Sequence, residues 1–105
     1  MALNVLIADD SKWSRKRLKA SFPEGWDAEI VEVSDGQQAL ASCDERMPDL
    51  LFLDLNMPNL DGFGVLRDLQ TRAKKPYIVV VSADCQPETI KQIRQLGASA
   101  FIEKR

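Results

Sequence analysis

Apolar runs that end in a polar residue organise this chain. The runs at residues 3–8, 50–53 and 78–81 are almost entirely hydrophobic, as is typical of strands buried on both faces. The segment 29–33 alternates in part between charged and apolar residues, which favours an edge strand. Residues 101–102 form a short fifth apolar run. We therefore expect five strands, of which the second is the most polar.

The segments between these runs have the signals of helices. Ser11 and Asp61 are candidate N-caps, Pro87 suits a first helical turn, and Gly97 suits the position after a helix end. We expect helices at about residues 11–22, 36–45, 61–73 and 87–96. Because strands and helices alternate, the fold class is α/β, with a parallel sheet and right-handed crossovers. The expected architecture is a doubly wound five-stranded sheet in the order 2-1-3-4-5, which is flavodoxin-like.

Polar residues follow four of the five predicted strands. Asp9 and Asp10 follow the first strand, Asp54 the third, Ser82 ends the fourth, and Lys104 follows the fifth. The carboxyl ends of parallel strands meet at one edge, where ligands of such sheets bind. Clustered carboxylates repel one another unless a cation intervenes, and Mg²⁺ is the natural partner. A metal, a lysine and a hydroxyl around one carboxylate would suit a phosphoryl group and make that carboxylate a nucleophile.

Composition narrows the functional classes. The 105 residues suffice for one domain, and the net charge of −2 gives no basic surface for nucleic acid or an anionic membrane. We find neither a membrane-spanning run nor a signal peptide. Cys43 and Cys85 are interpreted as free thiols in helix-like segments, which favours a reducing, cytoplasmic location. The chain has no histidine, so its chemistry must use carboxylates, a hydroxyl and lysine.

With these motifs in place, the chain resembles the receiver domain of bacterial two-component response regulators, including chemotaxis-type receivers. The matching motifs cover the whole chain in order: Asp9-Asp10, Asp54, Met57-Pro58, Asp61-Gly62, Ser82-Ala83 and Lys104. The resemblance implies that Asp54 is the phosphoacceptor. It also implies that Asp10 and Asp54 bind Mg²⁺ directly, that Asp9 acts mainly through water, and that Asn56 offers its backbone carbonyl to the metal.

The resemblance further implies a switch and its partners. Ser82, with Ala83, would bind the phosphoryl group, Lys104 would pair with it, and Phe101 stands at the family's aromatic switch position. The phosphoryl donor would be a histidine kinase or phosphotransfer protein of a phosphorelay. The output would be an effector protein or an output domain missing from this sequence. On this interpretation the chain is not an enzyme: it catalyses only its own phosphorylation and a slow autodephosphorylation.

Two features depart from the family pattern. Arg105 follows Lys104 where receivers usually carry proline, and the fifth helix of the fold is absent. Residues 1–105 are thus expected to be a receiver domain truncated at its C-terminus. Either a longer protein supplies the missing cover, or a second subunit or a partner fills the vacancy. In the second case the chain would form a homodimer or a complex through the uncovered sheet face.

Other interpretations remain open at this point. A phosphate-independent interaction module on a receiver fold would be expected to lack one of the acids or the lysine. A phosphatase of the haloacid dehalogenase type would require an acid at position 56, where this chain has asparagine. An FMN protein would not place Asp9 and Asp10 in its phosphate loop. Trp13 could pack on the sheet or lie on a partner surface. The basic run of the first helix is a solvated face or a kinase-docking surface; it comprises Lys12, Arg15, Lys16, Arg17 and Lys19.

Overall fold

The computed structural model describes residues 2–104. Strands and helices alternate along this part of the chain. In order, they are β1 (Leu3–Ala8), α1 (Lys12–Ala20), β2 (Ala28–Val33), α2 (Gly36–Glu45), β3 (Leu50–Leu53), α3 (Gly62–Gln70), β4 (Tyr77–Ser82), α4 (Pro87–Gln95) and β5 (Ala100–Glu103). The sheet is parallel throughout and has the order β2-β1-β3-β4-β5. The expected fold class and strand order are therefore confirmed, with β2 at one edge.

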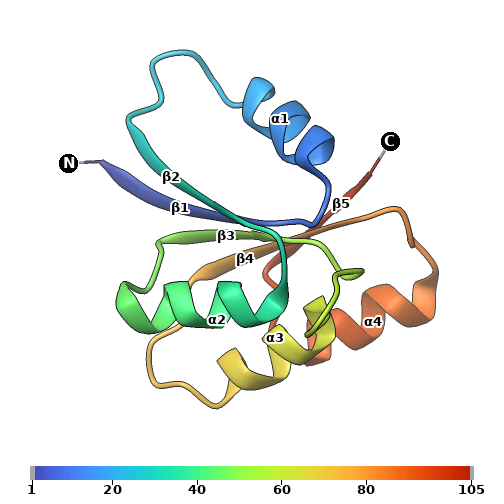
Figure 1. Ribbon diagram of the computed structural model, residues 1–105. Helices are drawn as coiled ribbons and strands as arrows, with labels where there is room; N and C mark the ends of the chain where they lie inside the picture. Colours follow the sequence, from blue (N-terminus) through green and yellow to red (C-terminus); the bar gives the residue numbers. More distant parts are fainter. Residues whose placement is uncertain (1, 105) are drawn as a thin grey trace.

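The helices divide unequally between the two faces of the sheet. Helices α2, α3 and α4 cover one face, and within residues 2–104 only α1 lies against the other (Figure 1). The side chains of the central strands alternate between two apolar clusters. Leu51 and Leu53 point into the larger cluster, on the side of the three helices. Phe52 belongs to the smaller cluster on the α1 side, which Leu18 and Phe22 cover.

The α1 face is less exposed than its cover by a single helix would suggest. Val5, Ile7, Phe52 and Val79 are all buried, because the segment after α1 also contributes. Phe22 lies over Phe52 with ring centroids 5.3 Å apart. It also contacts Trp26 edge-on, with centroids 4.8 Å apart. The smaller cluster is thus closed around Phe22, on the side of the sheet near β1 and β3.

The cover on this face stops short of β5. An open groove of about 250 Å³ lies between α1 and the strand ends, with Ile7, Phe52, Val81 and Leu18 among the residues that line it. Ile102 is 46% exposed and pairs in register with Val81. The groove therefore lies on the part of the sheet face that none of the helices of residues 2–104 covers. Among residues 2–104, none of the helices is long and apolar enough to cross a membrane.

Candidate functional site

Backbone hydrogen bonds continue the sheet past its last strand residues and bring the polar residues together. The Asp54 N–H donates to the carbonyl of Ala8 at 2.9 Å, and the Lys104 N–H donates to the carbonyl of Ser82 at 2.9 Å. Each site residue is thereby held beside the end of the neighbouring strand. The polar residues that follow the apolar runs in the sequence therefore lie together at a single edge of the sheet.

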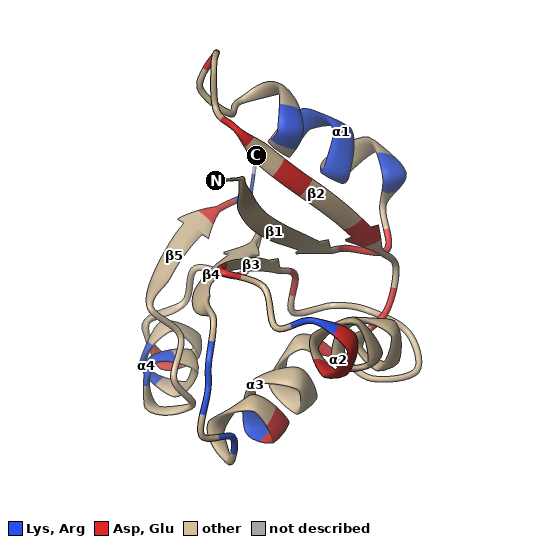
Figure 2. Ribbon diagram, turned by 90° about the vertical axis from the view of Figure 1, so that its left-hand side faces the viewer, with Lys and Arg blue, Asp and Glu red and all other residues tan. Residues whose placement is uncertain are grey.

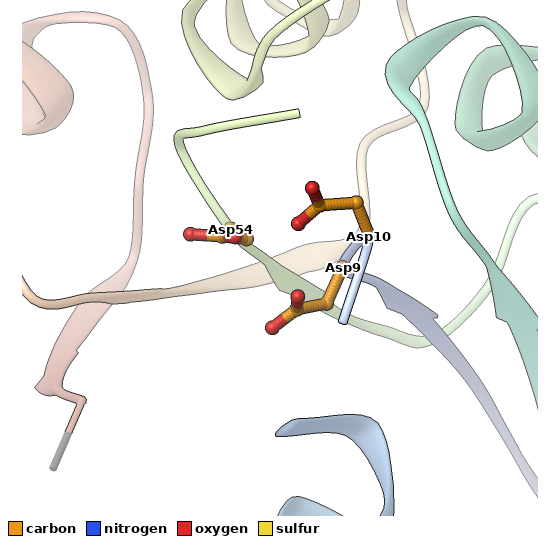
Figure 3. A group of neighbouring side chains, drawn as sticks. All are labelled: Asp9, Asp10 and Asp54. Atoms are coloured by element: carbon orange, nitrogen blue, oxygen red, sulfur yellow. The ribbon is translucent and has the colours of Figure 1, made fainter. Parts of the chain in front are cut away.

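Three carboxylates meet at this edge. Asp9, Asp10 and Asp54 each offer a carboxylate oxygen, and these oxygens lie within 4.8 Å of one another. Figure 3 shows the three side chains projecting from the ends of β1 and β3 into a common space. Asp9 and Asp54 are buried, whereas Asp10 is exposed. Oxygen ligands that are close together and open to solvent on one side fit Mg²⁺, which binds through a few carboxylates and keeps several waters.

Lys104 is the cation beside these carboxylates. Its Nζ lies 2.9 Å from Oδ2 of Asp9 and 3.3 Å from Oδ2 of Asp54. The structure therefore brings Lys104 to the site as expected, but its shorter contact is with Asp9. The sequence interpretation had paired Lys104 with the phosphoryl group and had not anticipated a contact with Asp9. One ammonium consequently neutralises part of the repulsion between two buried acids.

The environment of Asp54 favours its neutral form. Burial raises the pKa of Asp54 above its ordinary value, and the charge of Asp9 raises it further, against the opposing effect of Lys104. For Lys104, burial alone would lower the pKa. The hydrogen bond to Asp9 and the charges of both carboxylates outweigh burial, so the pKa of Lys104 is raised. These two shifts describe an acidic centre that holds more negative charge than one lysine can balance.

Asp9 is fixed by contacts that the sequence did not reveal. Its Oδ1 accepts a hydrogen bond from the Ser11 N–H at 2.9 Å, and Arg15 Nη1 donates to its backbone carbonyl at 2.6 Å. Arg15 also pairs with Glu32 of β2 at 3.0 Å. Arg15 therefore anchors the β1–α1 junction and is not simply part of a solvated face. The available signal was Glu32, a charged residue in a predicted strand, which in the structure pairs with Arg15 and Lys19 of α1.

Ser82 and Phe101 occupy different environments. Ser82 is fully buried, and its Oγ accepts a hydrogen bond from the Asp84 N–H at 3.1 Å. Ala83, the next residue, is exposed. Phe101 is half-buried on β5 and packs against the larger apolar cluster. These positions are compatible with the expected roles, which stay predictions.

The β3–α3 loop has a fixed shape. Asn56 is exposed, and its N–H makes a long contact of 3.5 Å with Oδ1 of Asp54. The loop returns to the sheet at Gly62, whose N–H donates to the carbonyl of Leu55 at 3.0 Å. A Cβ at Gly62 would lie 2.4 Å from the Asp54 carbonyl oxygen. Asp61 is the N-cap of α3, as expected, but the glycine after it is required by its contact with the backbone of Asp54.

The outer face of α1 is basic and carries an exposed tryptophan. Figure 2 shows the lysines and arginines along this helix, next to the acidic residues of β2. Lys19 pairs with Glu32 at 2.7 Å. Trp13 is 65% exposed and so does not pack on the sheet.

The two cysteines lie away from this face. Cys43 is buried in α2, whereas Cys85 is exposed in the loop before α4 and not in a helix; both are free.

Comparison with known proteins identifies the relatives of this chain. A family model described as "Response regulator receiver domain" matches residues 5–105, so the match includes Arg105, which lies outside the described residues. A protein-glutamate methylesterase/protein-glutamine glutaminase of Myxococcus xanthus is 42% identical over 104 residues, which are 97% of this chain and 30% of that protein. The chain thus spans about a third or less of the curated relatives it matches.

Solved structures give the same result. The response regulator domain of Thermotoga maritima CheB is 30% identical, with a TM-score of 0.83, covering 99% of this chain and 79% of that one. The CheX–CheY–BeF₃–Mg²⁺ complex from Borrelia burgdorferi contains a chain that is 30% identical, with a TM-score of 0.88, covering 98% of this chain and 78% of that one.

These relatives also correct one expectation. The sequence predicted that the protein is not an enzyme, and this prediction is contradicted by the curated relatives, which are named as methylesterases and glutaminases. The prediction considered only the chemistry of the acidic edge. It took no account of what lies in the remaining two thirds of such proteins.

Proposed function

This chain belongs to the response regulator receiver family, and on that basis we propose that it is a signalling switch in which Asp54 accepts a phosphoryl group. Phosphorylation-dependent signalling is the function of such receivers. The observation that supports this assignment best is the arrangement of Asp9, Asp10 and Asp54 around one space, with Lys104 against two of them.

We propose that Asp10 and Asp54 hold Mg²⁺ directly, with the backbone carbonyl of Asn56, and that Asp9 acts mainly through water. Asp9 is already engaged with Lys104 at 2.9 Å and with the Ser11 N–H at 2.9 Å. The exposed Asp10 is free of such contacts among the described residues. When bound, the metal supplies positive charge for the phosphoryl oxygens. It would also relieve the repulsion that raises the pKa of Asp54.

In the proposed transfer, an Oδ of ionised Asp54 attacks phosphorus. The P–O bond to Asp54 forms as the bond from phosphorus to the donor's imidazole nitrogen breaks, and the electron pair stays on that nitrogen. Lys104 then pairs with the transferred group, and its contact at 3.3 Å from Asp54 Oδ2 supports this role. Ser82 contributes its hydroxyl and Ala83 the neighbouring backbone.

The test uses acetyl phosphate, a donor in which acetate is the leaving group. With Mg²⁺, we expect intact mass to show one added phosphoryl group, and we expect no addition when the metal is chelated or when Asp54 is replaced in Asp54→Asn. Asp61→Asn is the matched control, because Asp61 caps α3 through Gly64 at 2.9 Å and lies outside the carboxylate cluster. Phosphorylation that persists in Asp54→Asn would refute the assignment. An unaltered chain that accepts none would instead favour a phosphate-independent interaction module.

The donor and the output are further parts of the proposal. The basic surface of α1 begins beside Asp9, and its exposed Trp13 suits docking of a histidine kinase or phosphotransfer protein there. Because the curated relatives are about three times longer and are named as methylesterases and glutaminases, we propose that this receiver regulates an output domain of that kind. Both proposals rest on the relatives and on the surface of α1, and not on the acidic edge.

A further inference from the structure

A fourth aspartate near the acidic edge has no place in the proposed chemistry. Asp35 caps α2 by accepting a hydrogen bond from the Gln38 N–H at 2.8 Å. A cap needs only one of its two carboxylate oxygens. The second oxygen, Oδ2, accepts from the side-chain amide of Asn59 at 2.8 Å and from that of Gln38 at 3.2 Å. Asp35 is only 6% exposed, so this contact is a shielded link between α2 and the β3–α3 loop.

The backbone beside this link shows how closely the two segments are fitted. The Gly36 N–H donates to the carbonyl of Leu60 at 2.9 Å. A Cβ at Gly36 would lie 2.2 Å from that carbonyl oxygen, so only glycine allows the approach. Asn59 itself has φ of 67°, in the left-handed region that asparagine tolerates better than most residues. Its backbone is thus bent so that its amide faces Asp35.

We infer that Asp35 and Asn59 are positioning residues that hold the β3–α3 loop in the shape required for metal binding beside Asp54. This inference rests on the proposed function, which places the Asn56 carbonyl on the metal. The loop leaves the sheet at Asp54 and is pinned again at Gly62. Between these points, the Asp35–Asn59 hydrogen bond and the adjoining Gly36–Leu60 hydrogen bond attach it to α2. Partners of this kind, which orient a ligand without touching the metal, commonly affect metal affinity.

The first test removes the hydrogen bond without straining the backbone. In Asn59→Gly the amide is lost, but glycine adopts a φ of 67° without steric cost. We expect the Mg²⁺ affinity measured by calorimetry to fall by about tenfold, with no loss of melting temperature in chelator. Gln70→Ala is the matched control. It removes a side-chain amide that links α3 to the Gln95 carbonyl at 2.9 Å, away from the acidic edge, and should leave Mg²⁺ affinity unchanged.

The second test reverses the donor and the acceptor. Asn59→Asp places two carboxylates face to face and should weaken Mg²⁺ binding at least as much as Asn59→Gly. In the double variant with Asp35→Asn, the new asparagine amide can donate to the new carboxylate at position 59. Helix α2 stays capped, since asparagine caps as well as aspartate. The Mg²⁺ affinity should return to within about threefold of that of the unaltered chain. Amide exchange of residues 55–61 should follow the same order.

The outcomes separate the inference from the proposed function. If the unaltered chain binds no Mg²⁺, the proposed function fails and the inference fails with it. If the unaltered chain binds Mg²⁺ and Asn59→Gly binds it equally well, the inference alone is overturned. A folded double variant that fails to recover affinity would overturn it too.

Discussion

Asp54 shows at the scale of one residue how burial and a neighbouring charge change the chemistry of a carboxylate. It is buried beside Asp9 and has one lysine for two charges, so its pKa is raised. The sequence placed Asp54 at a strand end and brought Lys104 to the same edge. It could not show that Lys104 lies closer to Asp9, nor that Gly62 must lack a side chain because it contacts the backbone of Asp54. The first fact depends on distances between segments far apart in the chain, and the second on how tightly the short loop after Asp54 returns to the sheet at Gly62.

The first prediction concerns how much the ionised form of Asp54 lowers the stability of the folded chain. Its pKa is 3.8 in the reference state and higher in the folded chain. In the window between these values the folded state binds more protons, so stability falls as pH rises through it, and the full cost is present above the folded pKa. In chelator at pH 7, Asp54→Asn should therefore raise the melting temperature by about 4 °C, the effect of about 1 kcal/mol in a domain of this size.

This gain should shrink as the pH falls through the raised pKa of Asp54, because the protonated carboxyl of the unaltered chain is neutral, as asparagine is. Asp27→Asn serves as the control, since Asp27 is exposed before β2 and should leave the melting temperature unchanged. A scanning calorimeter at several pH values measures both. A melting temperature for Asp54→Asn equal to or below that of the unaltered chain at pH 7 would contradict the electrostatic interpretation.

At the scale of elements, the sequence predicted existence and order better than helix ends. All five strands and four helices were expected, because apolar runs and capping residues are local signals. Helix α1 was expected to reach residue 22 and ends at Ala20, and α3 was expected to reach residue 73 and ends at Gln70. In both, a hydroxyl just after the helix donates to a carbonyl three residues earlier: Ser21 to Leu18 at 2.6 Å and Thr71 to Asp68 at 2.7 Å. Such local hydrogen bonds compete with helix continuation.

The second prediction couples β4, α4 and β5 to phosphorylation. A phosphoryl group adds about two negative charges, which should draw the Ser82 hydroxyl away from the Asp84 N–H. Asp84 also accepts from Thr89 of α4 at 2.8 Å, so α4 should respond. Beryllofluoride with Mg²⁺ should shift the amide resonances of residues 82–90 and of Phe101. Asp54→Asn, treated identically, should show no shifts. Occupancy of the site without changes at α4 and β5 would rule out the coupling.

At the scale of the whole molecule, the two sheet faces are covered to different degrees. The sequence anticipated a weak cover on the α1 face but overestimated the exposed area. It had counted Leu18 and Phe22 as the thin apolar stripe of the first helix, but not that Phe22 lies over Phe52 and is contacted by Trp26. What remains open is the groove lined by Leu18, Phe52 and Val81. Ile102 on β5, the register partner of Val81, is also exposed. The expectation that a following segment, a second copy or a partner covers this groove stays a prediction.

The third prediction is that the 105-residue chain uses this groove for contact. Exposed apolar patches mark interaction sites, so we expect it to self-associate at micromolar concentration and to bind an apolar dye. Ile102→Thr keeps a β-branched residue in the strand and should reduce both by more than half. Val31→Thr is the matched control: Val31 is 51% exposed on the opposite edge strand and should change neither. Sedimentation velocity measures association. A monomer that binds no apolar dye and has high thermal stability would contradict the expected self-association.

The acidic edge also has a temporal consequence, because its parts come from distant places in the chain. Lys104 is fifty residues from Asp54 and directly follows β5, which is the last of the five described strands in chain order. Contacts at such separation form late and only when the intervening segments are in place. A nascent chain in which β1 and β3 have already paired would hold Asp9 and Asp54 together without their cation. The chain should therefore become able to accept a phosphoryl group only after the whole sheet has formed.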